Sequence, residues 1–350
     1  MSIRVITGDC REVLKTLPDA SVHCCVTSPP YFGLRDYGIA EQIGLEPTAT
    51  AFVDELVQVF REVRRALRPD GTLWLNLGDS YNSIGHKKSS SGYGTSKLAG
   101  GEQTHSPLGR ETNAGGGLKH KDLIGIPWRV AFALQADGWW LRQDIIWSKP
   151  NSMPESVQDR CTKAHEYLFL LSKSPTYYCD MAAIAEPVTL STIARLDQDI
   201  ENQAGSDRVP GKTNGAMKAV RSRRDSFKRE DSKRAEVFPG QSAGTHRSDR
   251  EESDYPLDTR NKRSVWTVAT QPFKEAHFAT FPPALIEPCI LAGCPVGGTV
   301  LDPFGGAGTT GLVSDRLQRD AILIELNPTY ADMARSRIAS DAPLFAEIQT

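Results

Sequence analysis

The segment 299-TVLDPFGGAGTTG-311 decides the fold class of this 350-residue chain. Its apolar start predicts a strand that ends at Asp302, its glycines predict a tight loop, and the residues that follow predict a helix. The glycine spacing over 306–311 is G-x-G-x-x-G, which lets a backbone approach a nucleotide closely. The next predicted strand ends at Glu325, where such folds place the acid that binds ribose hydroxyls. The segment therefore predicts a nucleoside site rather than a structural turn.

The late position of this unit in the chain bears on which nucleoside it binds. A nicotinamide dehydrogenase normally begins with such a unit, whereas here only one further strand and one helix are predicted to follow. Asp302 adds an anion beside the loop, which is unfavourable for a pyrophosphate and favourable for a cationic sulfonium amino acid. S-adenosylmethionine is therefore the preferred cofactor, and an NAD-dependent oxidoreductase is the alternative.

The N-terminal part of the chain supplies the other strands of the predicted sheet. Apolar runs that suggest strands alternate there with stretches of helical periodicity, which is typical of a parallel α/β sheet. The predicted strands of this part are 3–9, 21–30 and 72–79, and two more follow at 141–147 and 166–174. Because the nucleoside unit comes last, we predict a Rossmann-like sheet in circularly permuted order, with long polar insertions.

A second motif, Thr27-Ser28-Pro29-Pro30-Tyr31, ends the predicted strand 21–30. Two consecutive prolines cannot donate to a strand ladder, so the strand must stop there. Parallel strands bring their carboxyl ends to one edge of the sheet, where α/β proteins bind ligands. We therefore expect this motif to lie beside the glycine loop, although nearly 280 positions separate the two in the sequence.

Two polar stretches interrupt the predicted domain. Residues 82–121 are rich in Gly and Ser, and residues 187–262 have the charged centre RSRRDSFKREDSKR. We interpret the cations of both stretches as phosphate contacts, with a solvated segment of no fixed structure as the alternative. The candidate contacts are Lys87, Lys88, Arg221, Arg223, Arg224, Lys228 and Arg229.

Composition narrows the class of protein. The formal net charge is −2 and the pI is about 6.4, which excludes a globally basic nucleic-acid binder. The seven cysteines are odd in number and form no C-x-x-C pair, so we expect buried thiols in a reducing compartment and no metal site. The sequence shows neither an apolar run of about 18 residues nor a signal-peptide pattern, which predicts a soluble cytoplasmic protein without a membrane partner.

The two motifs, in this order, resemble those of the amino-group DNA methyltransferases of the β arrangement, in which the catalytic motif precedes the cofactor motif. Residues 27–31 match the [DNS]-P-P-[YFW] catalytic motif of that family, and residues 302–310 match its cofactor loop. Glu325 matches its ribose-binding acid. Gly8-Asp9-Cys10 resembles the motif whose acid contacts the adenine amino group of the cofactor, and the segment before the glycine loop resembles the one that encloses the methionine part.

This resemblance implies a bacterial or phage-encoded, site-specific methyltransferase that uses S-adenosylmethionine and double-stranded DNA. Ser28 Oγ and the Pro29 carbonyl would hold the amino hydrogens of a base rotated out of the helix, Pro30 would stiffen the motif, and Tyr31 would stack on the base. The transfer would be direct, without a covalent enzyme intermediate. The implied cofactor-binding residues are Asp9, Thr27, Thr280, Phe281, Asp302, Phe304, Gly305, Gly306, Gly308, Thr309 and Glu325.

The resemblance also implies roles for the parts of the chain. Residues 1–81 would form the catalytic half, 82–121 a flexible basic loop, 122–186 the remainder of the same sheet, 187–262 a partly disordered target-recognition insertion, and 263–342 the cofactor-binding half.

Several points stay open at the level of the sequence. The target atom is adenine N6 or cytosine N4, and RNA or a protein amide is an alternative substrate. The family often forms homodimers, and neither the recognition sequence nor a restriction endonuclease partner can be read from the residues.

Overall fold

The computed structural model describes residues 2–34, 36, 38–39, 41–82, 115–189, 191–193, 259–271 and 281–341, together with the backbone of strand 347–349. The chain divides into two compact units, Met1–Ile184 with Arg263–Thr350 and Ala185–Lys262. In the second unit, the short strands β6 (Glu186–Pro187) and β7 (Thr259–Arg260) pair antiparallel, and the Glu186 carboxylate forms ion pairs with Arg260 and Lys262. Most of the two predicted insertions lies outside the described residues.

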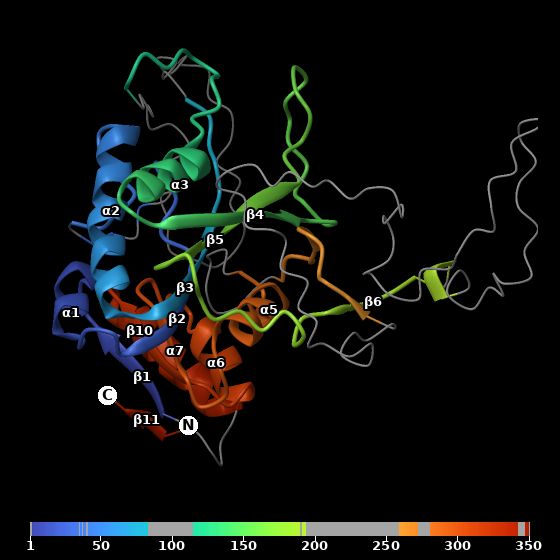
Figure 1. The fold of residues 1–350 in the computed structure, drawn as a ribbon. Coiled ribbons are helices and arrows are strands. Elements are labelled where there is room, and N and C mark those ends of the chain that lie inside the picture. The colour runs from blue at the N-terminus through green and yellow to red at the C-terminus, as the bar shows by residue number, and fades with distance from the viewer. Residues whose placement is uncertain are drawn as a thin grey trace, which may run out of the picture. The chain divides into compact units, whose positions relative to one another are not determined.

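In the described part of the first unit, nine strands form one sheet in the order β11-β1-β10-β9-β2-β3-β5-β4-β8 (Figure 1). The strands are β1 (Ser2–Thr7), β2 (Val22–Thr27), β3 (Leu67–Leu77), β4 (Trp140–Ser148), β5 (His165–Ser172), β8 (Val265–Thr267), β9 (Thr299–Asp302), β10 (Asp320–Glu325) and β11 (Glu347–Gln349). The helices are α1 (Cys10–Thr16), α2 (Ala49–Ala66), α3 (Ile126–Ala136), α5 (Pro283–Gly293), α6 (Thr309–Arg316) and α7 (Pro328–Asp341).

The sheet confirms the permuted Rossmann-like order. Strands β9 and β10, from the C-terminal part of the chain, lie between β1 and β2, from the N-terminal part, and all these pairs are parallel. The register pairs Cys25 with Leu301 at the centre. The carboxyl ends of β2 and β9 therefore meet at one edge of the sheet.

One half of the sheet differs from the expected all-parallel arrangement. Strand β5 runs antiparallel to both of its neighbours, β3 and β4. A parallel pair needs a crossover connection, and residues 149–164, which join β4 to β5, contain no helix that could supply one. As a result, the first residues of β5 lie at the same edge as the last residues of β3.

Two apolar layers hold the helices against the sheet. Helices α1, α2 and α3 pack on one face, where Phe52, Leu56 and Phe60 of α2 are fully buried at helical spacing (Figure 1). Helices α5, α6 and α7 pack on the other face, with Ile290 and Ile338 among the buried residues. Five of the seven cysteines are buried, and none of the helices in the described residues combines the length and apolar character that a membrane span requires.

Candidate active site

The two sequence motifs meet directly behind the edge of the sheet. Thr27 Oγ1, at the end of β2, donates a hydrogen bond of 2.6 Å to Asp302 Oδ1, at the end of β9. Beside this contact lies a cavity of about 260 Å³ that both motifs line. The predicted residues in its wall are Asp9, Ser28, Pro29, Pro30, Tyr31, Phe281, Phe304, Gly305, Gly306, Thr309 and Glu325.

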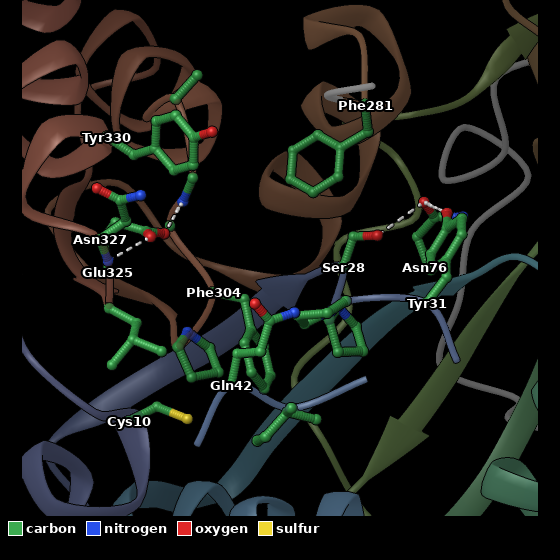
Figure 2. A pocket seen from close by; sticks show the side chains of 18 of the residues that line it. Cys10, Ser28, Tyr31, Gln42, Asn76, Phe281, Phe304, Glu325, Asn327 and Tyr330 are labelled. Carbon is green, nitrogen blue, oxygen red and sulfur yellow. Dashed lines mark hydrogen bonds between the residues drawn. The ribbon is translucent and has the colours of Figure 1, made fainter. Parts of the chain in front are cut away.

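Four polar and aromatic residues mark the two ends of this cavity, and one aromatic ring lies between them (Figure 2). Glu325 and Tyr330 lie at one end, and Ser28 and Tyr31 lie at the other. The ring of Phe304 lies between the two ends in this view. We call these the cofactor end and the base end, after the functions that the two motifs predict.

Main-chain groups hold the carboxylate at the cofactor end. Glu325 Oε2 accepts a hydrogen bond of 2.8 Å from the Gly306 N–H, and Oε1 accepts one of 2.9 Å from the Asn327 N–H. Gly306 can aim its N–H in this direction because it adopts a φ of 49°, which glycine tolerates best. Burial raises the pKa of Glu325, and the two N–H groups counteract part of that rise. The carboxylate is therefore fixed in place with lone pairs left for a ligand.

The proximity of Asp302 to the glycine loop predicted that its side chain faces the cavity, but it does not line the cavity. It is 1% exposed, and its carboxylate accepts hydrogen bonds from Thr27 Oγ1, Thr310 Oγ1 (2.6 Å) and the Phe304 N–H (3.0 Å). The pKa of Asp302 is raised, because the effect of burial outweighs that of these three donors, which lower it. Asp302 therefore joins β2, the glycine loop and α6 from behind the wall, because buried carboxylates need donors on every side.

Gly308 also lies behind the wall. It precedes α6 with a φ of 75°, and a Cβ at this position would lie 2.8 Å from the Cβ of Ala334 in α7. The glycine is thus required by its backbone conformation and by the close approach of two helices. Thr280, like the seven predicted lysine and arginine contacts, lies outside the described residues.

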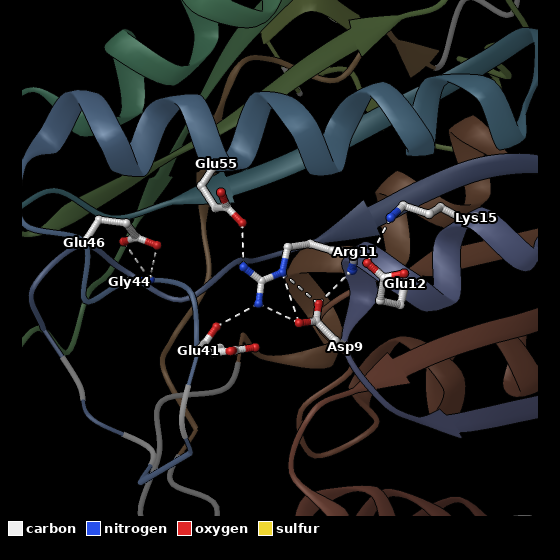
Figure 3. Close-up of polar contacts among 8 residues, drawn as sticks. All are labelled: Asp9, Arg11, Glu12, Lys15, Glu41, Gly44, Glu46 and Glu55. Carbon is white, nitrogen blue, oxygen red and sulfur yellow. Dashed lines mark hydrogen bonds and ion pairs between the residues drawn. The ribbon is translucent and has the colours of Figure 1, made fainter.

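Asp9 lines the cavity but is engaged by Arg11 (Figure 3). Its carboxylate caps α1 by accepting from the Arg11 N–H at 2.8 Å and also binds the Arg11 guanidinium. The same guanidinium contacts Glu55 of α2 and the carbonyl of Glu41. Burial alone would raise the pKa of Asp9, but the hydrogen bonds from Arg11 outweigh it and lower the pKa. The predicted contact with the cofactor's adenine would therefore share this carboxylate with Arg11.

Side chains of β3, of β5 and of the loop that follows β2 meet at the base end. Ser28 Oγ donates to Asn76 Oδ1 at 3.3 Å, and the Tyr31 hydroxyl lies 2.7 Å from Glu166 Oε2 and 3.2 Å from Asn76 Oδ1. Asn76 is buried and its amide donates to the Tyr167 carbonyl at 3.0 Å. Glu166 also forms an ion pair with Lys149. These contacts hold the Ser28 and Tyr31 side chains in defined positions.

Residues that sequence reasoning missed complete this end. Asn76 and Glu166 carry no motif of their own, although Asn76 stands near the end of β3, beside β2, which ends directly before Ser28. The position of Asn76 could have been found by inspecting every carboxyl end of the predicted sheet. Glu166 could not, because the strand at whose start it lies was expected to run parallel, which would have placed Glu166 at the opposite edge of the sheet. Among the described residues, no group of His, Cys, Asp or Glu is arranged to hold a metal ion.

Comparison with known proteins identifies the family. The sequence profile of the DNA methylase family N6_N4_Mtase matches residues 22–336. The chain is 42% identical over 337 residues to the Type II methyltransferase M.SmaI of Serratia marcescens, an alignment that covers 96% of this chain and 91% of that protein.

Solved structures agree in fold. TTHA0409 of Thermus thermophilus, a putative DNA modification methylase solved in complex with S-adenosyl-L-methionine, superposes with a TM-score of 0.54 at 24% identity and covers 99% of this chain and 100% of its own. The cytosine-N4-specific PvuII DNA methyltransferase superposes with a TM-score of 0.56 at 17% identity, covering 98% and 93%. The expectation from the two motifs is confirmed: the chain belongs to the DNA methylase family of the N6/N4 type.

Proposed function

We propose that this DNA methyltransferase transfers a methyl group from S-adenosylmethionine to the exocyclic amino nitrogen of a base rotated out of double-stranded DNA. The observation that carries the proposal is the single cavity lined by both Ser28–Tyr31 and the glycine loop. The cofactor end offers a fixed carboxylate, and the base end offers a rigid set of acceptors. Direct transfer requires both in one enclosure, because the reacting atoms must approach in line.

The residues at the cofactor end fit S-adenosylmethionine. When bound, it supplies an electrophilic methyl group on a sulfonium, whose carbon–sulfur bond breaks as the base nitrogen bonds to carbon. The lone pairs of Glu325 that Gly306 and Asn327 leave unused can accept hydrogen bonds from ribose hydroxyls. Phe281 and Phe304 supply apolar walls between the two ends.

The residues at the base end compensate for a weak nucleophile. The lone pair of an exocyclic amine is delocalised into the ring, so acceptors must hold the two amino hydrogens and turn the lone pair toward the methyl group. Ser28 Oγ gives its own hydrogen to Asn76, which leaves its lone pairs available as acceptors. The Pro29-Pro30 pair fixes the direction of the Pro29 carbonyl. The proton leaves the nitrogen for solvent after the methyl group has been transferred, so the step requires no strong general base.

Tyr31 provides the surface on which the base is placed. Its hydroxyl is held by Glu166, and its ring lies against Gly78, where a Cβ would be 2.3 Å from Tyr31 Cε2. A ring held from both its edge and its face presents a fixed stacking surface to a base. Adenine and cytosine both suit this end, because each carries an amino group next to a ring nitrogen that accepts hydrogen bonds.

We also propose that the unit Ala185–Lys262 takes part in reading the DNA sequence. It forms a compact unit of its own, and its centre contains Arg221, Arg223, Arg224, Lys228 and Arg229. Arginine is the side chain that most often contacts guanine specifically, and clustered cations neutralise phosphates. Lys87 and Lys88 are proposed as phosphate contacts by the second of these arguments. A charge-reversed variant of 221–229 should lose DNA affinity and its salt dependence while cofactor affinity is unchanged.

The experiment that tests the function measures transfer of a tritium-labelled methyl group to duplex DNA, to RNA and to protein, alongside calorimetry with S-adenosylmethionine and NAD. We expect label in DNA only and binding of S-adenosylmethionine only. Long-read sequencing of DNA from an expressing host then identifies both the base and its sequence context. Label in RNA or protein, or binding of NAD without S-adenosylmethionine, would refute the proposal.

A further inference from the structure

Lys149 places an ammonium group in the wall of the base end. It follows β4 directly, and its side chain is 17% exposed. The ammonium forms an ion pair with Glu166 Oε1 and lies 4.2 Å from the centroid of the Trp147 ring, which also lines the cavity. These two partners therefore fix the ammonium of an otherwise flexible side chain.

The position of Lys149 is tied to the catalytic motif through one carboxylate. Glu166 Oε1 binds Lys149, and Glu166 Oε2 accepts from the Tyr31 hydroxyl at 2.7 Å. Tyr31 is the residue proposed to stack on the base. The ammonium therefore stands at the same end of the cavity as the acceptors for the amino group.

The charge of Lys149 by itself works against the reaction. The base nitrogen becomes positively charged as it takes up the methyl group, and a nearby unpaired ammonium would oppose that change. Glu166 balances the charge of Lys149, so what the pair offers to a ligand is an N–H donor. Of the three ammonium hydrogens, the described residues account for one at Glu166 and one direction toward the Trp147 ring. One donor direction remains for a group in the cavity.

We propose that Lys149 is a specificity-determining residue that donates a hydrogen bond to the ring nitrogen next to the amino group of the extruded base. This nitrogen is N3 of cytosine or N1 of adenine, and it is an acceptor in both. Thymine N3 and guanine N1 carry a hydrogen, so a donor opposite them rejects these bases. The inference rests on the proposed function, because it needs a base in this cavity.

The test removes the two partners of the proposed hydrogen bond separately and together. Duplexes carry either the normal target base or its deaza analogue, 3-deazacytosine or 1-deazaadenine, in which C–H replaces the ring nitrogen. For the wild-type protein we expect the analogue to lower kcat/KM by about 10- to 100-fold, since a buried donor loses its acceptor. For Lys149→Met we expect a similar loss on the normal duplex and no further loss, within about twofold, on the analogue. Lys149→Arg keeps a donor, so in this variant the analogue should still lower kcat/KM, though by less than in the wild-type protein.

Lys163→Met is the matched control. The Lys163 side chain is also 17% exposed and its Nζ lies 4.0 Å from Asp79 Oδ2, but it does not line the cavity. This variant should show the full wild-type penalty for the analogue. Thermal melting and cofactor affinity of each variant separate a loss of folding from a loss of recognition.

Two outcomes would overturn the inference. Suppose that the reduction in kcat/KM for Lys149→Met on the analogue equals the product of the two single reductions. Lys149 then acts only through Glu166. If Lys149→Met instead weakens DNA binding, lowers its salt dependence and shows no coupling to the analogue, the ammonium contacts a phosphate. Both outcomes are distinct from a failure of the proposed function, in which the wild-type protein would methylate no base of any duplex.

Discussion

The two ends of the cavity are held by different kinds of hydrogen bond. At the cofactor end, main-chain N–H groups hold the carboxylate: Gly306 and Asn327 donate to Glu325. At the base end, side chains hold one another: Ser28 contacts Asn76, and Tyr31 contacts Glu166. A main-chain donor persists through most substitutions, whereas a side-chain partner is lost with a single one.

The two ends also differ in how far apart in the sequence their hydrogen-bond partners lie. Glu325 lies 19 and 2 positions from its two main-chain donors, so one short segment contains most of the cofactor end. Asn76 lies 48 positions from Ser28, and Glu166 lies 135 positions from Tyr31. We therefore expect the base end to be the more sensitive to substitution, and the predictions that follow test this difference from the largest effect to the smallest.

Ser28→Ala should lower kcat by about 10²- to 10³-fold, because the amino group of the base loses an acceptor that orients its lone pair in the transition state. The dissociation constant for S-adenosylmethionine should stay within about twofold of wild type. Single-turnover methyl transfer and calorimetry measure the two quantities. Ser80→Ala, at a serine outside the cavity wall, is the control and should be fully active. A kcat near that of wild type in Ser28→Ala would show that the motif is only structural.

Glu325→Gln should produce the opposite pattern at the cofactor end. The neutral amide keeps the size of the side chain but weakens its hydrogen bonds to ribose hydroxyls, so KM for the cofactor should rise by about 10- to 100-fold, which corresponds to about 1.4 to 2.8 kcal/mol. At saturating cofactor, kcat should change little. Steady-state kinetics with varied cofactor distinguish the two. A fall in kcat with an unchanged KM would contradict the assignment of this end.

Thr27→Val removes the hydrogen bond that joins the two motifs behind the cavity wall. Asp302 would lose one of its donors while remaining buried, and we expect the free energy of unfolding to fall by about 1–3 kcal/mol. Denaturant unfolding measures this loss. Thr310→Val removes the other hydroxyl donor to Asp302, on the α6 side, and should cost a similar amount. Transfer should fall more in Thr27→Val than in Thr310→Val, since Thr27 adjoins Ser28. Equal kinetic effects would show that the two motifs are not linked through this contact.

The affinity for the cofactor should also depend on pH through Glu325. Because burial raises the pKa of this carboxyl above its usual value of 4.5, it takes up a proton at a higher pH than an exposed glutamate would. Protonation removes acceptor capacity, so affinity should be constant at neutral pH and fall as the pH decreases through the raised pKa. Calorimetric titrations at a series of pH values measure this. In Glu325→Gln the same series should be flat over that range, apart from effects of global unfolding. A decrease of equal size in the variant would assign the pH dependence to another group.

Much of the fold could be predicted because its signals are local. The alternation of strands and helices, the stop at Pro29-Pro30 and the glycine loop each depend on a few neighbouring residues, and the order of the motifs indicated the permuted sheet. The direction of β5 could not be predicted in this way. A strand pattern carries no information about parallel or antiparallel pairing, which depends on the connection and on the neighbouring strands.

The residues of the site likewise fall into those whose placement follows from local sequence signals and those whose placement depends on tertiary packing. The sequence by itself determined that Ser28–Tyr31 and the segment from Asp302 to Glu325 would meet, because carboxyl ends of parallel strands share one edge. Only the tertiary structure decided that Asp302 faces Thr27 and Thr310 instead of a ligand, and that Asn76, Glu166 and Lys149 complete the base end. The geometry of the main chain depends on the residues of a short segment. The partner of a side chain, by contrast, depends on which distant residue the packed sheet brings within hydrogen-bond distance.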